Sequence, residues 1–261
     1  MAQAEMREGM GEVVQAKSGT LPTLLENSDL KGILHNHSTY SDGKHSLRQM
    51  AEHCKALGYE YLGISDHSRT ASYAGGLEIE KVAKQQAEIE LLNQELAPFR
   101  IYKGIESDIL PDGSLDYPAE VLRSFDFIVS SVHSVLNMDL KRATDRLLTA
   151  IHNPYTTILG HPTGRLLLRR EGYPIDHKAI IDACAEKQVV IEMWYVNSLV
   201  DQKQERPPVR WVGVGYSARN RLVFCATKFG VIGFNMDGSI IVLEDVSMTT
   251  QYTGVSMRIK F

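Results

Sequence analysis

Two histidines separated by one residue, His35 and His37, follow a short apolar segment that has the composition of a β-strand. Alternate side chains of an extended strand share a face, so we expect the two imidazoles to point the same way. Two imidazoles on one face can chelate a metal ion, and Asp42 follows closely enough to serve a neighbouring ion. The same residues also fit a pair of surface histidines beside an Asp-Gly turn, because His-x-His is a short and common pattern.

Later strand-like segments end in the same way, and this favours metal binding. Four of them deliver an imidazole or a carboxylate, carried by His67, Glu106, His133 and His161. In a parallel α/β barrel the carboxyl ends of all strands open on one face, so we expect these side chains to meet there. Imidazole and carboxylate ligands suit zinc, manganese or iron. Several such ions in one bowl are typical of phosphate-ester hydrolysis of the two-metal type.

Basic residues near the same strand ends offer donors for a phosphate. Lys103 and Arg165 are predicted to contact the substrate, and Arg169-Arg170 adds further donors. Each of these cations also fits an ordinary solvated surface charge. The residues to which we assign the catalytic role are Glu106, His133 and Arg165.

Other polar residues receive lesser roles. Asp66 either orients a neighbouring histidine or is an ordinary turn residue. Asp108 and Asp112 are predicted to shape the turn at residues 110–114. The remaining histidines lie in or beside predicted helices and are interpreted as surface or capping groups: His45, His53, His152 and His177.

The elements that must position these residues alternate along the chain. Strand-like runs are expected at residues 32–34, 61–65, 100–105, 127–132, 157–160 and 189–192, and helical spacing at 46–57, 78–96, 140–151 and 176–185. This alternation predicts parallel βαβ units, and a repeated series predicts an α/β barrel. Beyond residue 193 the chain has no histidine, and Asp237-Gly238 lies between two apolar runs like the turn of a hairpin.

Composition sets the class of protein. The 261 residues are 43% hydrophobic and 23% charged, which is typical of a globular chain with one large core. No apolar run approaches the roughly 18 residues of a membrane span, and the three cysteines form no C-x-x-C pair, so we expect a cytoplasmic protein without thiolate zinc sites. A net charge of −4 predicts no broad electrostatic grip on nucleic acid.

Five motifs follow one another in a fixed order: His35-Asn36-His37, Ser65-Asp66-His67-Ser68, Gly104-Ile105-Glu106, Ser131-Val132-His133-Ser134 and Gly160-His161-Pro162. Together they resemble the PHP (polymerase and histidinol phosphatase) superfamily. More narrowly, Gly75-Gly76-Leu77, the run Leu110-Pro111-Asp112-Gly113-Ser114 and His161-Pro162-Thr163-Gly164-Arg165 resemble the C-terminal PHP domain of bacterial family X DNA polymerases.

The resemblance implies an α/β fold, a distorted (β/α)7 TIM-like barrel with up to three divalent ions, manganese or zinc. It implies phosphodiester hydrolysis by a 3′-5′ exonuclease that processes DNA 3′ ends in DNA repair, with a polymerase domain on the same chain. His35 and His37 would hold the first ion, with Glu106 bridging to a second. The other ligands implied are His133 and His161 for the second ion, and Asp42 and His67 for the third.

The chain departs from this pattern at its C-terminal end. Family members close the barrel with an Asp-x-His on a seventh strand, and no such motif follows residue 193 here. We therefore expect a lead-in at 1–30 that resembles the segment after a polymerase part, an incomplete PHP domain at 31–193 and a divergent tail at 194–261. Two other functions stay open: a small-molecule phosphatase of the histidinol phosphatase type, and a catalytically inactive metal-binding fragment.

Overall fold

The structure is a computed structural model of the chain. It describes residues 12–20, 30–165 and 170–192, together with the backbone of four further strands at 216–217, 222–227, 230–235 and 240–243. A helix, α1 (Glu12–Ser18), lies in the lead-in, where the sequence showed no clear period. Among the described residues, no helix combines the length and the apolar character needed to cross a bilayer.

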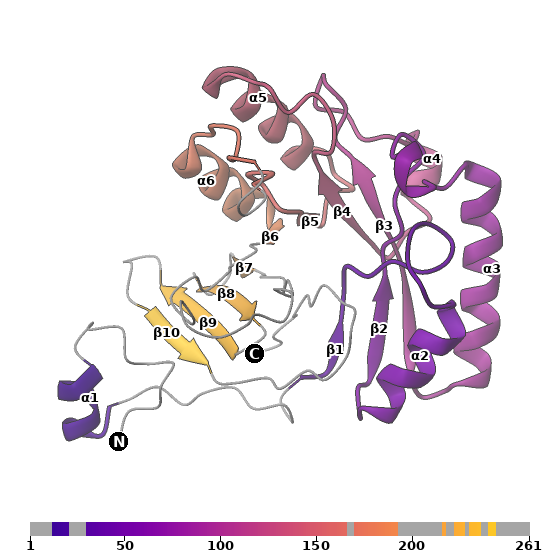
Figure 1. Cartoon of the computed structure of the whole chain (residues 1–261), viewed down its shortest axis with the longest axis horizontal. Helices are drawn as coiled ribbons and strands as arrows, with labels where there is room; N and C mark the ends of the chain where they lie inside the picture. Colours follow the sequence, from indigo (N-terminus) through magenta and orange to yellow (C-terminus); the bar gives the residue numbers. More distant parts are fainter. Residues whose placement is uncertain are drawn as a thin grey trace.

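A parallel sheet of six strands in sequence order forms the centre of the fold (Figure 1). Each neighbouring pair is parallel, so every strand delivers its carboxyl end to the same edge of the curled sheet. This curled half-barrel confirms the expected α/β class. The strands are β1 (Gly32–Ile33), β2 (Tyr61–Ile64), β3 (Arg100–Asp108), β4 (Phe127–Ser131), β5 (Ile158–Leu159) and β6 (Val190–Ile191).

The connecting helices begin and end close to the predicted positions. Helix α2 (Leu47–Ala56) starts at a capping box in which Ser46 and Gln49 each accept the other's backbone N–H. Helices α5 (Leu140–Ile151) and α6 (His177–Lys187) begin at the aspartate caps Asp139 and Asp176. The remaining connections are α3 (Ile79–Glu95), α4 (Ala119–Leu122) and the 3-10 helix η3 (Ser72–Ala74).

The core lies between the sheet and these helices. One cluster joins β1–β3 to α2 and α3 around Leu62, Ile89 and Ile101, all buried. A larger cluster joins β3–β6 to α5 and α6 around Ile105 and Leu147. All five residues of β4 are buried, and its sequence begins with an apolar run that makes the strand recognisable.

Beyond residue 193 the described backbone forms an antiparallel sheet of β7 (Tyr216–Ser217), β8 (Leu222–Thr227), β9 (Gly230–Asn235) and β10 (Ile240–Leu243). Strands β9 and β10 pair antiparallel, as the hairpin prediction required. The division of the chain at residues 30 and 193 stays a prediction. The seventh parallel strand of the family pattern is not among the described residues.

Candidate metal centre

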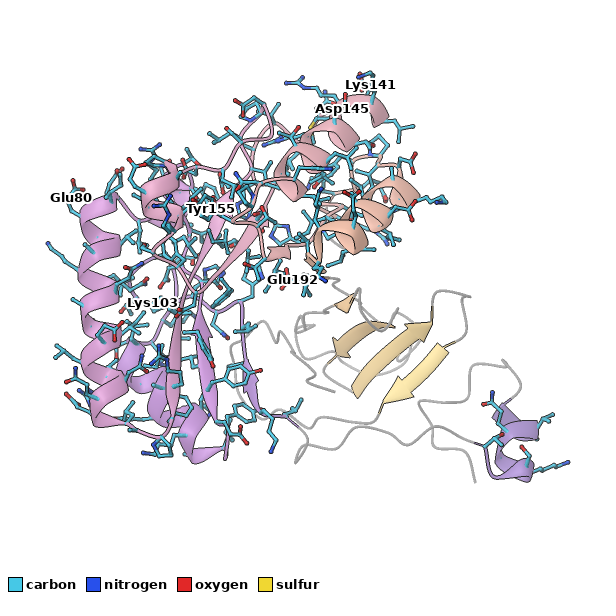
Figure 2. The ribbon with its side chains drawn as sticks, turned by 180° about the vertical axis from the view of Figure 1, so that it is seen from behind. Glu80, Lys103, Lys141, Asp145, Tyr155 and Glu192 are labelled. Atoms are coloured by element: carbon cyan, nitrogen blue, oxygen red, sulfur yellow. The ribbon has the colours of Figure 1, made fainter. Side chains whose placement is uncertain are left out.

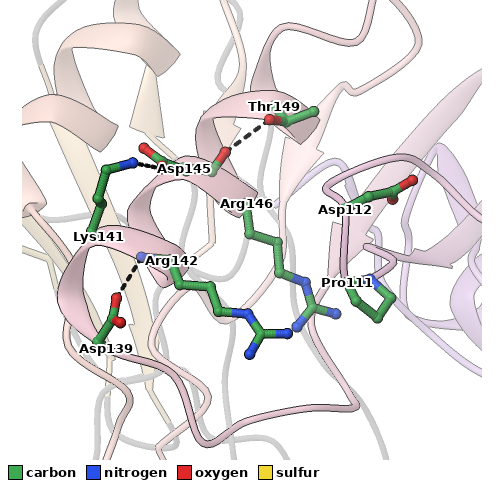
Figure 3. A pocket seen from close by; sticks show the side chains of 8 residues that line it. All are labelled: Pro111, Asp112, Asp139, Lys141, Arg142, Asp145, Arg146 and Thr149. Atoms are coloured by element: carbon green, nitrogen blue, oxygen red, sulfur yellow. Dashed lines mark hydrogen bonds and ion pairs between the residues drawn. The ribbon is translucent and has the colours of Figure 1, made fainter.

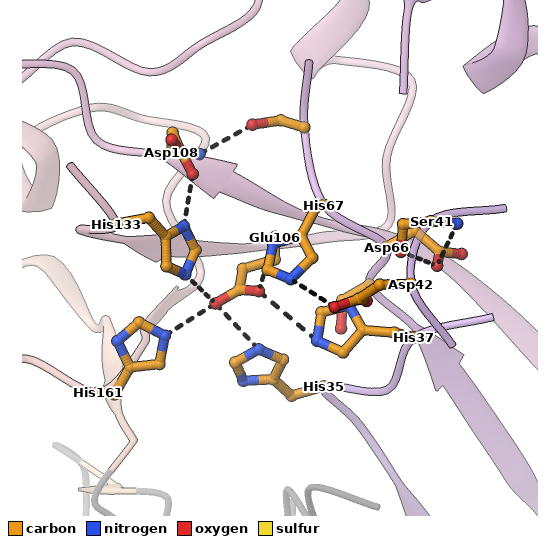
Figure 4. Close-up of polar contacts among 12 residues, drawn as sticks. His35, His37, Ser41, Asp42, Asp66, His67, Glu106, Asp108, His133 and His161 are labelled. Atoms are coloured by element: carbon orange, nitrogen blue, oxygen red, sulfur yellow. Dashed lines mark hydrogen bonds and ion pairs between the residues drawn. The ribbon is translucent and has the colours of Figure 1, made fainter. Parts of the chain in front are cut away.

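Five histidine side chains surround one carboxylate at the carboxyl edge of the sheet (Figure 4). Glu106 lies inside β3 and is 1% exposed, so its oxygens face the cluster instead of water. A ring nitrogen of every histidine approaches a Glu106 oxygen within 2.9–3.6 Å: His161 at 2.9 Å, His35 and His67 at 3.1 Å, His133 at 3.2 Å and His37 at 3.6 Å. The structure therefore brings together all the histidines assigned to the cluster.

The backbone at His35 and His37 is not the extended strand that the sequence analysis expected. Strand β1 ends at Ile33, and His35 has a φ of 58°, so His35 and His37 do not share a strand face by simple alternation. His161 also has a positive φ, 23°. Left-handed backbone at a residue with a side chain is uncommon and concentrates at functional sites. Gly160 is required just before His161, because a Cβ there would lie 2.2 Å from Ser131 Oγ.

Electrostatics at the cluster depend on opposing effects of burial and charge. Burial lowers the pKa of His37 to about 3, so this imidazole is neutral at physiological pH. Burial also lowers the pKa of His133, but hydrogen bonds to Asp108 and Glu106 outweigh it and raise the pKa to about 9. Burial disfavours the ionised form of Glu106, yet the surrounding histidines hold its pKa well below the usual value. The surrounding histidines thus stabilise the buried, ionised carboxylate of Glu106.

The cluster fits divalent metal ions. His37 Nδ1 and His67 Nδ1 are buried and have no hydrogen-bond partner in the described part of the chain. His67 Nδ1 lies 3.1 Å from Glu106, but without the angle of a hydrogen bond. A buried polar atom without a partner is costly, and a bound metal ion would give these two imidazole nitrogens a partner. Neutral imidazole and carboxylate are the ligands that zinc and manganese bind.

Three sets of side chains place a ligand atom from each member within 4.8 Å of the others: His35-His37-Glu106, His37-Asp42-His67 and His67-Glu106-His133. The first two sets contain the residues that the family resemblance implied for the first and third ions. The third set joins Glu106 and His133 to His67, where the resemblance implied His161. Asp42 is half-exposed, with its oxygens 3.8 Å from His67 and 3.9 Å from His37.

Two further carboxylates accept hydrogen bonds from histidines of the centre, on the side of each ring that faces away from Glu106. The sequence analysis did not assign them to the centre. Asp108 Oδ1 accepts a hydrogen bond from His133 Nδ1 at 2.5 Å, and Glu192 Oε1 accepts one from His35 Nδ1 at 2.6 Å. The prediction that Asp108 only shapes a turn was incomplete. Asp108 and Glu106 lie two residues apart in β3 and share a strand face, and Glu192 directly follows β6, so strand periodicity offered a signal for both.

Asp66 holds the loop between His37 and Asp42, and its hydrogen bonds go to that loop and to helix α3 instead of to a histidine. Its carboxylate is fully buried and accepts hydrogen bonds from the backbone and hydroxyl groups of Ser38 and Ser41 and from Gln85 Nε2 of α3. Burial raises its pKa, and the hydrogen bonds from the two serines partly offset this. Asp66 therefore fixes the segment that carries Asp42.

The structure does not bring Lys103 to the centre. Its Nζ donates to Glu90 of α3 at 2.7 Å (Figure 2). Lys103 lies three positions before Glu106 in β3, and side chains at odd spacing in a strand point to opposite faces, so Lys103 points to the helix layer. Arg165 is exposed in the loop after His161, and Arg170 donates to the carbonyl of Gly164 in the same region. Arg169 lies outside the described residues.

A cavity of about 280 Å³ lies away from the histidines, between α5 and the turn at 111–112 (Figure 3). Its lining balances three basic residues, Lys141, Arg142 and Arg146, against three aspartates. Lys141 is paired with Asp145 at 2.5 Å. The cavity holds no convergent set of ligands or acid–base groups, so the histidine cluster is the candidate functional site.

Comparisons with known proteins identify relatives of this chain. Residues 34–193 match the PHP domain family. The DNA polymerase/3′-5′ exonuclease PolX of Bacillus subtilis is 44% identical over 189 residues, which are 72% of this chain but 33% of that protein, so the chain spans about a third of its length. A probable phosphatase of Caldanaerobacter subterraneus is 26% identical over 238 residues, 84% of this chain and 85% of that protein.

A solved structure gives a weaker likeness. Histidinol phosphate phosphatase from Lactococcus lactis, solved with zinc, L-histidinol and phosphate, is 18% identical, with a TM-score of 0.46 over 62% of this chain and 72% of that one.

Proposed function

Because this chain belongs to the PHP domain family, as its match over residues 34–193 shows, we propose that it is a metal-dependent phosphoesterase that acts on the 3′ ends of DNA. The family membership confirms the resemblance drawn from the motifs. The observation that carries the proposal is the convergence of five imidazoles on the buried carboxylate of Glu106. The choice of DNA is supported by the 44% identity to PolX.

In this proposal the cluster holds divalent ions, manganese or zinc. The residues that would hold them are His35, His37, Asp42, His67, Glu106, His133 and His161. Bound ions would polarise the phosphate ester and lower the pKa of a water at the site. Glu106 supplies a buried negative charge beside all five imidazoles, and this charge would offset part of the positive charge of the bound ions.

The surrounding residues set the orientation of the ligands. Asp108 and Glu192 each accept the Nδ1 proton of a histidine, so Nε2 of His133 and of His35 faces Glu106. We assign to Arg165, exposed in the loop after His161, the contact with the phosphate. Lys103 has no part in the proposal, because its ammonium group is paired with Glu90.

A small phosphate monoester is the second candidate substrate. It is favoured by the probable phosphatase that this chain matches over 85% of that protein's length. We also propose that this protein has a polymerase domain, as the name of PolX indicates for that relative. This chain covers 33% of PolX.

The test uses the full chain, manganese or zinc, and two substrates. One is a duplex with a recessed 3′ end whose recessed strand is labelled at its 5′ end, and the other is histidinol phosphate. We expect the labelled strand to shorten in single-nucleotide steps, with little phosphate released from histidinol phosphate. Glu106→Gln should abolish the shortening, because it removes the shared carboxylate, whereas His53→Ala, an exposed histidine of α2, should leave it unchanged.

The outcomes separate the candidate functions. Release of phosphate from histidinol phosphate without shortening of DNA would replace the exonuclease with a phosphatase. Failure to act on either substrate, in a protein that still binds ions through the cluster, would identify a catalytically inactive metal-binding module. Failure to bind ions at all would overturn the proposal.

A further inference from the structure

One aromatic side chain at the metal centre has no role in holding ions. Tyr73, in the 3-10 helix η3, is 72% exposed, although it lies between Ala71 and Ala74, which are buried. Its ring centroid lies 6.2 Å from that of His67 and 6.5 Å from that of His133. The rings are inclined by 57° and 74°, so neither histidine is stacked parallel to Tyr73. The ring thus lies beside the centre with most of its surface exposed.

The segment that carries Tyr73 is held at both ends. Ser68 forms a β-bridge with Leu77, and Leu77 N–H donates to His67 O at 2.8 Å. The two ends of the segment therefore lie side by side. Thr70 N–H donates to Asp116 Oδ2 at 2.8 Å. Gly76 permits the closure, because a Cβ there would lie 2.0 Å from Ser68 O. Tyr73 therefore lies in a short loop whose ends are joined by backbone contacts and which is also held by the hydrogen bond to Asp116.

We propose that Tyr73 stacks on a planar ring of the substrate whose phosphate is bound at the histidine cluster, and that it thereby selects phosphate esters that carry a nucleobase. This inference rests on the proposed function, since it names the part of the substrate next to the scissile bond. A base joined to its phosphate through one sugar lies several ångströms from it, and the Tyr73 ring lies 6.2 Å and 6.5 Å from the rings of His67 and His133, two residues that would hold the ions. Aromatic stacking accepts every base, because every base has a π-face.

The charge of the surroundings also favours this role over a contact with the phosphate itself. The charged groups that act on Tyr73 are the carboxylates of Asp108, Glu106 and Asp42 and one cation, Arg170, which donates to the carbonyl of Gly164. A phenol ring gains contact area with a flat apolar face without needing a positive charge, and a phosphate is bound instead by cations. The ring is the part of Tyr73 that the proposal uses, and its hydroxyl is not required.

The test compares Tyr73→Ala with Tyr73→Phe in the full chain with manganese. The substrates are two labelled duplexes that differ only in the 3′-terminal unit, which is a normal nucleotide in one and an abasic sugar in the other. We expect Tyr73→Ala to raise KM for the normal end by roughly 5- to 150-fold and to leave the abasic end unchanged. Tyr73→Phe should resemble the unaltered chain on both. Tyr102→Ala, an exposed tyrosine elsewhere in β3, is the matched control.

Other outcomes overturn the proposal. Equal losses on both duplexes would mean that Tyr73 supports the loop and not the base. A fall of kcat in Tyr73→Phe would assign the work to the hydroxyl group. A parallel experiment with histidinol phosphate and glycerol phosphate tests whether Tyr73 recognises an imidazole ring instead of a nucleobase. A loss of activity in Tyr73→Ala on histidinol phosphate alone would mean that the ring recognised is an imidazole.

Binding separates this inference from the proposed function. Deoxyadenosine monophosphate and deoxyribose phosphate are titrated into the full chain with manganese by calorimetry. Stacking predicts that Tyr73→Ala weakens binding of the nucleotide alone, whether or not the chain cleaves DNA. Equal binding of the nucleotide by the variant and the unaltered chain would remove the proposal, even if the exonuclease activity were present.

Discussion

The hydrogen bond between His133 and Asp108 joins the metal centre to the loop around it. His133 Nδ1 donates to Asp108 Oδ1 at 2.5 Å, and His133 Nε2 lies 3.2 Å from Glu106 on the other side of the ring. Asp108 Oδ2 accepts a second hydrogen bond from Thr70 Oγ1 at 3.0 Å. Because a carboxylate only accepts, the Nδ1 position must carry a proton, and the opposite nitrogen is the one turned to the cluster.

Replacing this carboxylate should weaken metal binding. In Asp108→Asn the histidine loses a charged acceptor that fixes its tautomer, and we expect metal affinity or activity to fall about 10- to 100-fold. Titration of manganese into the metal-free protein measures the affinity. The control is Asp112→Asn, because Asp112 accepts hydrogen bonds from Ser114 in an exposed turn. Equal affinities for the two variants would show that Asp108 does not position His133.

Glu192 should have the same importance for the opposite side of the centre. Its Oε1 accepts from His35 Nδ1 at 2.6 Å, and its Oε2 lies 3.2 Å from the backbone N–H of His161, which donates to it. In Glu192→Gln one acceptor oxygen becomes an NH2 group that must face an N–H donor. We expect metal affinity to fall by about tenfold or more, while circular dichroism stays unchanged. The comparison is Glu186→Gln, an exposed glutamate of α6.

The stability of the metal-free protein should depend on pH in a defined window. The pKa of His133 is raised from 6.5 to about 9, because its hydrogen bonds outweigh burial, and the pKa of His35 is raised as well. Protonated His133 therefore stabilises the fold fully below pH 6.5, and this contribution, about 3 kcal/mol at most, is lost as pH rises through 9. Below pH 6.5 stability is lost in turn, because the pKa values of His37 and His67 are lowered.

Thermal unfolding in the presence of a chelator measures this dependence. We expect Tm to be highest near pH 6.5 and to fall towards pH 9. With manganese or zinc the fall on the alkaline side should vanish, because a histidine that binds a metal ion is already neutral at pH 6.5. A metal-free protein whose Tm is constant between pH 6.5 and pH 9 would contradict the assigned protonation of His133.

Asp66 should matter for stability more than an exposed aspartate does. In Asp66→Asn one oxygen becomes an NH2 group that meets the donors of Ser38 and Gln85, and all of these groups are buried. We expect a loss of about 2–4 kcal/mol in the free energy of unfolding, measured with urea. Asp145→Asn removes an exposed ion pair with Lys141, which water screens, and should change the free energy of unfolding much less. A similar small loss for both would refute the anchoring role.

Much of the fold followed from local patterns. The limits of α5, Leu140–Ile151, agree with the prediction, because Asp139 caps the helix and its apolar residues recur at helical spacing. Strand β3 extends further than predicted, to Asp108, since pairing with β4 continues through Ser131. Helix α4 was not predicted, because four residues are too few to show a period.

The candidate site was predicted in part. The histidines and Glu106 could be chosen because each follows or ends an apolar run. The position of Lys103 near a strand end predicts a contact with the substrate, but strand alternation turns its side chain to the opposite face from Glu106. Glu192 follows β6 as His161 follows β5, so the series of strand-end residues extends to it.

The kind of residue at each strand end and the order of the motifs can be read from the chain alone, because hydrophobic periodicity and motif spacing are local properties. Which carboxylate accepts a hydrogen bond from which histidine depends on the three-dimensional arrangement of the strands. His35 and Glu192 are 157 residues apart, and His133 and Asp108 are 25 apart. Contacts over such separations are set by the register and curvature of the sheet, which no single segment encodes.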